Sequence, residues 1–194
     1  MIRNKRLLTG FAATAALGTF LGVLAKLCDT AVPADPLGNL FFAFGLVSSG
    51  LLFWAFLCAV LSLSARNGLH AALLTLCLLT PMLLSYYAVS RYHVGYYSPG
   101  VARFWAWMLL PSAVCAWILR AYRHVRWLRV LTAAGAVCLF LFDRRYLMCG
   151  SIRAELAETG LLAGLLAVLL TAEKNAPKNR PCAVQFRYRQ QTEI

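Results

Sequence analysis

The sequence predicts an all-α fold, a polytopic bundle of about six membrane-spanning helices with both termini in the cytoplasm. Of the 194 residues, 61% are hydrophobic and only 13% are charged, whereas a soluble domain typically has about 25% charged residues. The hydrophobic residues gather in long runs, and most of the 19 Lys and Arg residues border those runs on what would be one side of a membrane. These observations indicate a single integral membrane domain.

The predicted spans follow from the length of the apolar runs. A helix that crosses a bilayer needs about 20 mainly apolar residues, and its backbone must be helical because lipid offers no hydrogen-bonding partners. The predicted spans are residues 7–27, 39–64, 69–90, 101–119, 128–142 and 156–171. They form one domain over residues 1–172, and a basic cytoplasmic tail over 173–194 follows, which we expect to be disordered.

Each span has its own justification. The first exceeds the roughly 7–15 apolar residues of a signal-peptide core, so we expect it to be retained. The second and third are long apolar runs on either side of Arg66, and the third and fourth contain Pro81 and Pro111. Both prolines remove a backbone donor, so we expect kinks there. The fifth and sixth are short, which a locally thinned bilayer accommodates.

The distribution of charge predicts the orientation. An N-terminus inside the cell places the N-terminal basic cluster, the basic loop after the fourth span and the tail in the cytoplasm, as the positive-inside rule favours. Most carboxylates then lie on the external side, namely Asp29, Asp35, Asp143, Glu155 and Glu158. Topology thus explains the net charge of +12, and we expect the lipid bilayer rather than nucleic acid as partner.

The segment 85–107 is the strongest candidate for a binding surface, because it combines most of the eight tyrosines with basic and Trp side chains. Such residues anchor proteins at membrane interfaces, but their density here exceeds that need. We predict an outward-facing pocket for a small molecule, in which Arg91 or Arg103 binds an anionic group. The predicted lining is Tyr86, Tyr87, Arg91, Tyr92, His93, Tyr96, Tyr97, Arg103, Trp105 and Trp107, with Lys26, Asp29 and Asp143 at the rim. Alternatively, Lys26 and Asp29 pair with each other, because they lie three residues apart on one helix.

The first span is rich in small residues. Ala12 and Ala16 lie one helical turn apart, as do Gly18 and Gly22, and small faces let helix backbones approach closely. These residues either pack within the chain or bind a membrane partner subunit. The alternative function is therefore a non-catalytic accessory or structural protein that binds its partner through this helix.

Catalytic and metal-binding motifs are not apparent. The sequence has no HExxH, GxSxG or Walker A motif, and none of its seven cysteines forms a CxxC pair. We therefore expect no catalytic residues, no metal and no cofactor, although an enzyme that uses His93 and Asp143 remains a third possibility. Cys28 and Cys149 fall near the predicted external side, and a disulfide between them is left open.

Several motifs occur in a recognisable order: GVLAKLCD, LGNL, AALLTLCLLTPMLLSYYAVS, YYSPGVARFWAWMLLPSAVCAWILRAYR and FLFDRRY. In this order they resemble an uncharacterised family of small bacterial integral membrane proteins, a domain of unknown function, over roughly residues 18–146. The resemblance implies a multi-pass protein of the bacterial cytoplasmic (inner) membrane and no particular activity. A weaker, architectural likeness is to substrate-binding subunits of energy-coupling-factor vitamin transporters, in which Ala12 and Ala16 would meet a partner.

Overall fold

The computed structural model describes residues 2–32, 35–120, 126–146 and 152–174, and the regular structure within these ranges is entirely helical, as predicted. The helices are α1 (Ile2–Asp29), α2 (Pro36–Ser49), α3 (Leu51–Ser64), α4 (Gly68–Val89), α5 (Pro99–Leu119), α6 (Arg126–Tyr146) and α7 (Ile152–Lys174). A π-helical turn, η1 (Ser90–Val94), continues α4. Cys149 and, beyond the end of α7, the predicted tail lie outside the described residues.

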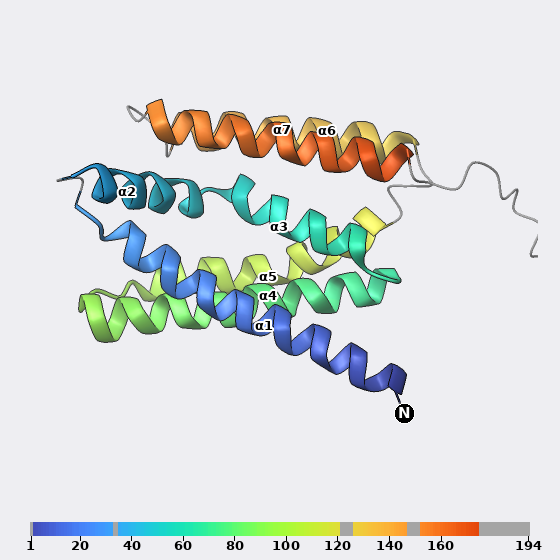
Figure 1. Cartoon of the computed structure of the whole chain (residues 1–194), viewed down its shortest axis with the longest axis horizontal. Helices are drawn as coiled ribbons and strands as arrows, with labels where there is room; N and C mark the ends of the chain where they lie inside the picture. Colours follow the sequence, from blue (N-terminus) through green and yellow to red (C-terminus); the bar gives the residue numbers. More distant parts are fainter. Residues whose placement is uncertain (1, 33–34, 121–125, 147–151, 175–194) are drawn as a thin grey trace, which may run out of the picture.

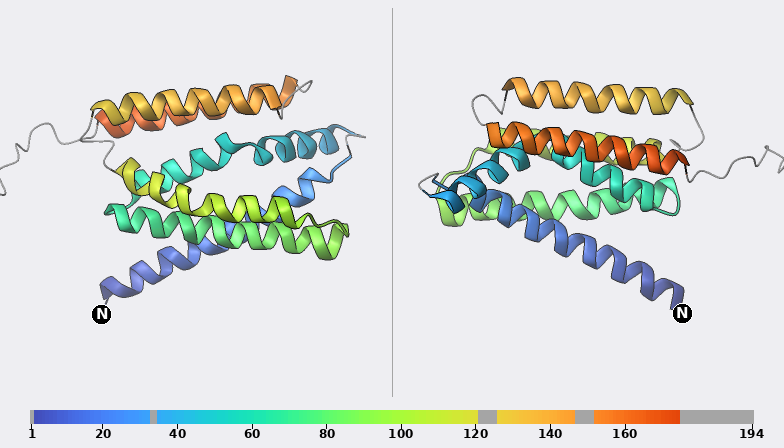
Figure 2. Two further views of the ribbon diagram at one scale, coloured as in Figure 1. Left: turned by 180° about the vertical axis from the view of Figure 1, so that it is seen from behind. Right: turned by 45° about the horizontal axis from the view of Figure 1, so that its top comes forward.

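The helices lie along a common long axis in three groups (Figure 1). The helices α1, α4 and α5 form one side, α2 and α3 run end to end through the middle, and the α6–α7 hairpin covers the opposite side (Figure 2). The start of α1 and the end of α7 lie at the same end of the bundle. The ends of α1, α4 and α6 lie at the other end, which we call the loop end.

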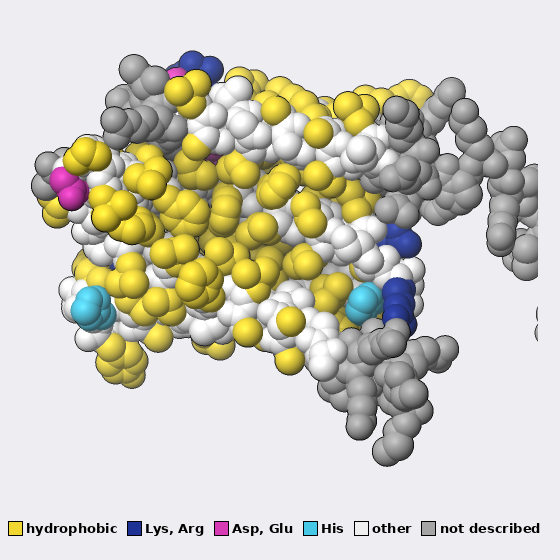
Figure 3. All heavy atoms as spheres, in the orientation of Figure 1, with side chains coloured by type: hydrophobic (Ala, Val, Ile, Leu, Met, Phe, Trp, Pro, Cys, Tyr) yellow, Lys and Arg dark blue, Asp and Glu magenta, His cyan; other side chains and the backbone are white. Residues whose placement is uncertain are grey.

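The described residues contain several helices suited to a membrane. Three segments are long and apolar enough to cross one, Thr9–Asp29, Gly68–Val94 and Pro99–Leu119, which confirms the first, third and fourth predicted spans as candidates. Apolar side chains cover the middle of the visible face, and charged side chains gather at its two ends (Figure 3). The chain is therefore a membrane protein. The predicted fifth and sixth spans fold as α6 and α7, and their crossing of the bilayer stays a prediction.

The predicted second span, residues 39–64, is not one continuous helix. The helices α2 and α3 meet at Gly50 with a bend of 70°. The hydroxyls of Ser48 and Ser49 donate to the carbonyl oxygen of Gly45 at 3.1 and 2.9 Å, a local pairing that competes with regular helical hydrogen bonds. We call this junction the α2–α3 break.

The two prolines at which the sequence predicts kinks do not interrupt their helices. Pro81 lies inside α4 and Pro111 inside α5, and both helices continue past them. The helical backbone of a predicted span is thus interrupted at the Ser-Ser-Gly segment between α2 and α3, and not at a proline.

The most extensive contact between two of the described helices is that of α1 with α4. Gly18 and Gly22 lie against the α4 backbone, where a Cβ at either position would overlap the carbonyl oxygen of Leu78 or Met82. The two glycines are buried because they let the backbones approach. This pair of small residues therefore packs within the chain.

The helix α3 connects the two sides of the bundle. On one side, Trp54 packs with Leu78, Leu79 and Met82 of α4. On the other, buried residues of α3, α6 and α7 form a second apolar cluster, made of Leu52, Ala59, Leu63, Ala136, Leu165 and Leu169. The α2–α3 break at the start of α3 thus lies between two packed cores.

Replacement of Gly18 or Gly22 by Ala is expected to lower the melting temperature of the purified protein. The added Cβ has no space against the α4 backbone, and overpacking of this kind costs about 1–3 kcal/mol. The matched control is Gly10→Ala in the same helix, where a Cβ meets nothing within 4 Å and where Ala is favoured over Gly. Equal melting temperatures for the three variants would contradict the α1–α4 packing.

Candidate functional site

Two neighbouring cavities lie beside the α2–α3 break, between it and α4 and α5. The first, the loop-end cavity, has a volume of about 120 Å³. It is lined by Ala25, Ser48, Ser49, Trp54, Met82, Leu83, Tyr86, Tyr87, Val101 and Trp105. The second, the mid-bundle cavity, has a volume of about 290 Å³, and its lining includes Cys58, Leu79, Met108, Leu109 and Ser112. Trp54, Met82, Leu83 and Trp105 line both cavities, so the two share a wall.

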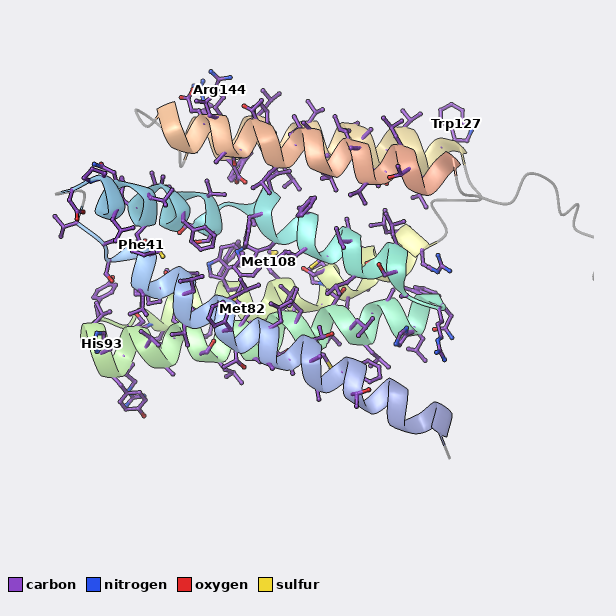
Figure 4. The ribbon with its side chains drawn as sticks, in the orientation of Figure 1. Phe41, Met82, His93, Met108, Trp127 and Arg144 are labelled. Atoms are coloured by element: carbon purple, nitrogen blue, oxygen red, sulfur yellow. The ribbon has the colours of Figure 1, made fainter. Side chains whose placement is uncertain are left out.

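Figure 4 shows the setting of these cavities. The side chains of Met82 and Met108 lie between α2–α3 and the α4–α5 pair; Met82 is buried, whereas Met108 is 37% exposed. Both methionines line the mid-bundle cavity, and Met82 lines the loop-end cavity as well. The flexible methionine side chain adapts its shape to its neighbours, which suits a wall between two adjoining spaces.

Lys26, Asp29 and Tyr86 form a polar cluster beside the loop-end cavity. Lys26 Nζ donates to Asp29 Oδ2 at 2.8 Å, and the Tyr86 hydroxyl donates to the same oxygen at 3.1 Å. The Lys26 nitrogen also lies 5.1 Å from the centre of the Tyr86 ring. The ion pair that the three-residue spacing suggested is therefore present, and it leaves this cluster without net charge.

Only part of the predicted aromatic surface reaches a cavity. Tyr86 and Tyr87 pack edge to face with ring centres 5.3 Å apart, and Tyr87 and Tyr97 do so at 5.9 Å. Tyr86, Tyr87 and Trp105 line the loop-end cavity. The structure thus brings Lys26, Asp29, Tyr86, Tyr87 and Trp105 together at this end.

The remaining predicted residues lie on the exposed surface. They are Arg91, Tyr92, His93, Tyr96, Arg103 and Trp107. The first four follow α4, in or beside the π-helical turn Ser90–Val94 and the left-handed Gly95, with φ of 75°. Arg91 lies over the Tyr92 ring at 5.7 Å, and His93 is at the loop end (Figure 4). Neither arginine lines a cavity.

Asp143 lies apart from Lys26 and Asp29, on the other side of α2–α3. It is 0% exposed, and its Oδ2 accepts a hydrogen bond from the Leu52 backbone N–H at 2.7 Å. A Cβ on Gly50 would come within 2.9 Å of the same oxygen, which explains glycine at this position. Asp143 therefore caps the N-terminus of α3, where a carboxylate is favoured.

Trp54 forms a hydrogen bond with a backbone carbonyl group on the cavity side of the same break. Its indole Nε1 donates to the carbonyl oxygen of Ser48 at 2.7 Å, and the Gly50 N–H donates to Val47 at 3.1 Å. These bonds satisfy carbonyls that the end of α2 leaves without helical partners. Sequence reasoning missed Trp54, Ser48 and Ser49 as site residues, although a Ser-Ser-Gly segment inside an apolar run was the available signal.

The small residues of α1 divide into two groups. Gly18 and Gly22 are buried against α4, whereas Ala12 and Ala16 are exposed. The prediction of a partner-binding face on the first helix therefore depends on the two alanines.

No group of three or more His, Cys, Asp or Glu side chains could hold a metal ion within the part of the chain that the structure describes. No family model matches the sequence, and neither a curated protein nor a solved structure shows detectable similarity to it. The resemblance of its motifs to an uncharacterised bacterial membrane family stays a prediction.

The replacement Trp54→Phe is expected to destabilise the protein. It leaves the Ser48 carbonyl oxygen without its indole donor, and a buried unpaired polar group costs about 1–3 kcal/mol. The matched control is Trp107→Phe, because Trp107 is 71% exposed. Melting temperatures in the same detergent provide the comparison, and an equal effect of the two replacements would contradict the role of Trp54 at the break.

Proposed function

We propose that this protein binds a small amphipathic molecule in the two neighbouring cavities, as a binding or transport protein of the bacterial cytoplasmic membrane. The observation that carries the proposal is that two cavities of different polarity share a wall of four side chains. The bacterial location is taken from the resemblance of the motifs, and the transport step from the position of the cavities inside a membrane bundle.

The two cavities differ in the chemistry that they offer. Ser48, Ser49 and the Tyr86 ring line the loop-end cavity, so hydroxyl and ring-edge groups are available there. The mid-bundle cavity is lined mainly by carbon and sulfur, for example by Leu79, Met108 and Leu109. Binding sites for small molecules typically combine an apolar body with a few polar groups. A molecule with a polar head toward the loop end and an apolar body toward the middle matches this arrangement.

The charges near the loop-end cavity favour an uncharged or zwitterionic head. Lys26 and Asp29 neutralise each other at 2.8 Å, and Arg91 and Arg103 are exposed outside the cavity linings. A charged head without a partner would lose its hydration with no compensation. The anionic ligand group expected from the sequence is therefore replaced in this proposal by an uncharged one.

Charge also supports the orientation. Arg66 and Arg120 lie in or beside the connections at the end opposite the loop end, close to each other, since Arg120 donates to the Arg66 carbonyl oxygen at 3.4 Å. By the positive-inside rule, we propose that this end, at which α1 begins and α7 ends, lies in the cytoplasm together with both termini. The loop-end cavity then faces the external side, and six crossings follow if α6 and α7 span the bilayer.

We expect a radiolabelled monoacylglycerol, which has an uncharged head and one acyl chain, to bind saturably to the protein in nanodiscs. The replacement Leu83→Trp fills the wall that both cavities share. It is expected to weaken binding by about tenfold or more, which corresponds to about 1.4 kcal/mol. The matched control is Leu84→Trp, because the neighbouring Leu84 is exposed and lines neither cavity.

Two results would contradict the proposal: the absence of saturable binding, or an equal loss in the Leu83 and Leu84 variants. A lysophosphatidic acid of the same chain length tests the head group. It is expected to bind more weakly than the monoacylglycerol. Tighter binding that is lost in Arg91→Ala would instead locate the site on the exposed aromatic surface.

A further inference from the structure

Two carboxyl groups lie buried and close together between α2–α3 and the α6–α7 hairpin. Asp143 on α6 is 0% exposed, and Glu158 on α7 is 1% exposed. The negative charge of Asp143 acts on Glu158, so the two carboxyl groups are electrostatic neighbours on adjacent helices. The sequence had assigned both to the external side with the other carboxylates, whereas the structure places them inside the protein.

The pair has more acceptors than donors. Asp143 Oδ1 and both carboxyl oxygens of Glu158 have no hydrogen-bond partner among the described residues. Buried polar atoms without partners are costly, and two adjacent buried carboxylates cannot both remain ionised. A single proton converts one of the acceptors into a donor and thereby joins the two groups by a hydrogen bond.

The two carboxyl groups are not equivalent. Asp143 Oδ2 accepts the Leu52 N–H at 2.7 Å, at the N-terminus of α3, where both the hydrogen bond and the helix dipole stabilise a negative charge. Glu158 has no donor of this kind. We infer that Asp143 and Glu158 form a proton-binding site at the α2–α3 break, in which Glu158 holds the proton and donates it to Oδ1 of an ionised Asp143.

Among the described side chains, no cation forms a hydrogen bond with Asp143 Oδ1 or with the carboxyl oxygens of Glu158. On α6, the exposed Arg144 pairs with Glu155 of α7 at 3.4 Å and opposes the charge at Glu158 only from the surface. The helices α2 and α3 contain no Asp, Glu, Lys, Arg or His, and Cys58 is their single ionisable side chain. Lys26, a buried cation, pairs with Asp29 on the α1 side. A proton is therefore the charge that compensates the second carboxyl group.

Proton release on unfolding tests this inference with the full chain in weakly buffered detergent at neutral pH. Carboxyl groups of an unfolded chain ionise near pH 4 and are therefore ionised at neutral pH, so unfolding by sodium dodecyl sulfate should release the proton of Glu158. The variant Glu158→Gln keeps a donor for Asp143 but holds no titratable proton, and it should release about one proton fewer per chain. The matched control Glu155→Gln removes a partly exposed carboxyl of the same helix that pairs with Arg144, and it should behave like the wild type.

The same argument fixes the sign of the pH dependence. Because the native state binds one proton more than the unfolded state, stability decreases as the pH rises. For each unit of rise in pH, the unfolding equilibrium constant of the wild type should increase relative to that of Glu158→Gln, by up to about tenfold. Glu155→Gln should retain the wild-type slope.

Equal proton release by the wild type and Glu158→Gln would overturn the inference. Were Glu158→Gln unable to fold, the infrared spectrum of the wild type decides: a protonated-carboxyl band at neutral pH supports the site, and its absence refutes it. A different outcome would indicate a sodium site instead of a proton site. In that case sodium chloride, but not choline chloride, raises the melting temperature, and it does so only in protein that contains Glu158. The inference does not depend on the proposed ligand, so monoacylglycerol binding can fail while the proton site stands.

Discussion

At Gly50 the backbone of α2 and α3 leaves its helical hydrogen-bonding pattern in the interior of an apolar bundle. Backbone polar groups have no water to bind in such a place, so side chains must pair them. Trp54 does so on one side, and Asp143 does so on the other. The bond from Leu52 to Asp143 joins residues 91 positions apart in the sequence and ties the α6–α7 hairpin to the middle of the bundle. This bond, together with the apolar cluster that α3 forms with α6 and α7, positions the hairpin and buries Glu158.

The break also lies between the two proposed sites. Ser48 and Ser49, just before it, line the loop-end cavity, and Asp143 contacts it from the opposite face. Under our two proposals, a ligand and a proton bind on opposite faces of one short, non-helical segment. Broken helices near the middle of a membrane form binding sites in transporters for the same reason: their ends present unpaired backbone groups and charge. The arrangement gives the proton site a physical route by which it can influence the cavity.

Much of the fold was accessible from the sequence because long apolar runs require helices in a membrane. The ion pair of Lys26 and Asp29 followed from spacing alone, since both residues lie on one helix. The break at Gly50 was not predicted, because Ser-Ser-Gly inside an apolar run is compatible with a continuous span and the prolines seemed stronger signals. The burial of Glu158 depends on packing between distant helices, which no local pattern encodes.

The candidate site was predicted in part for a related reason. Tyr86, Tyr87 and Trp105 reach a cavity because they lie on the faces of α4 and α5 that line it, whereas Trp107 lies on the exposed face of α5. Arg91 and His93 lie on the π-helical turn that follows α4, and both are exposed. Residue type identified the segment, but the local backbone geometry decided which of its side chains turn inward.

Hydrogen exchange of the backbone amides at the start of α3 tests the central claim most directly. In nanodiscs, the amides of residues 51–54 should exchange slowly in the wild type. The replacement Asp143→Ala should accelerate this exchange, because it removes the acceptor of the Leu52 N–H. Leu141→Ala, at an exposed position of the same helix, should leave it unchanged. Equal exchange in the wild type and Asp143→Ala would contradict the account of the α2–α3 break.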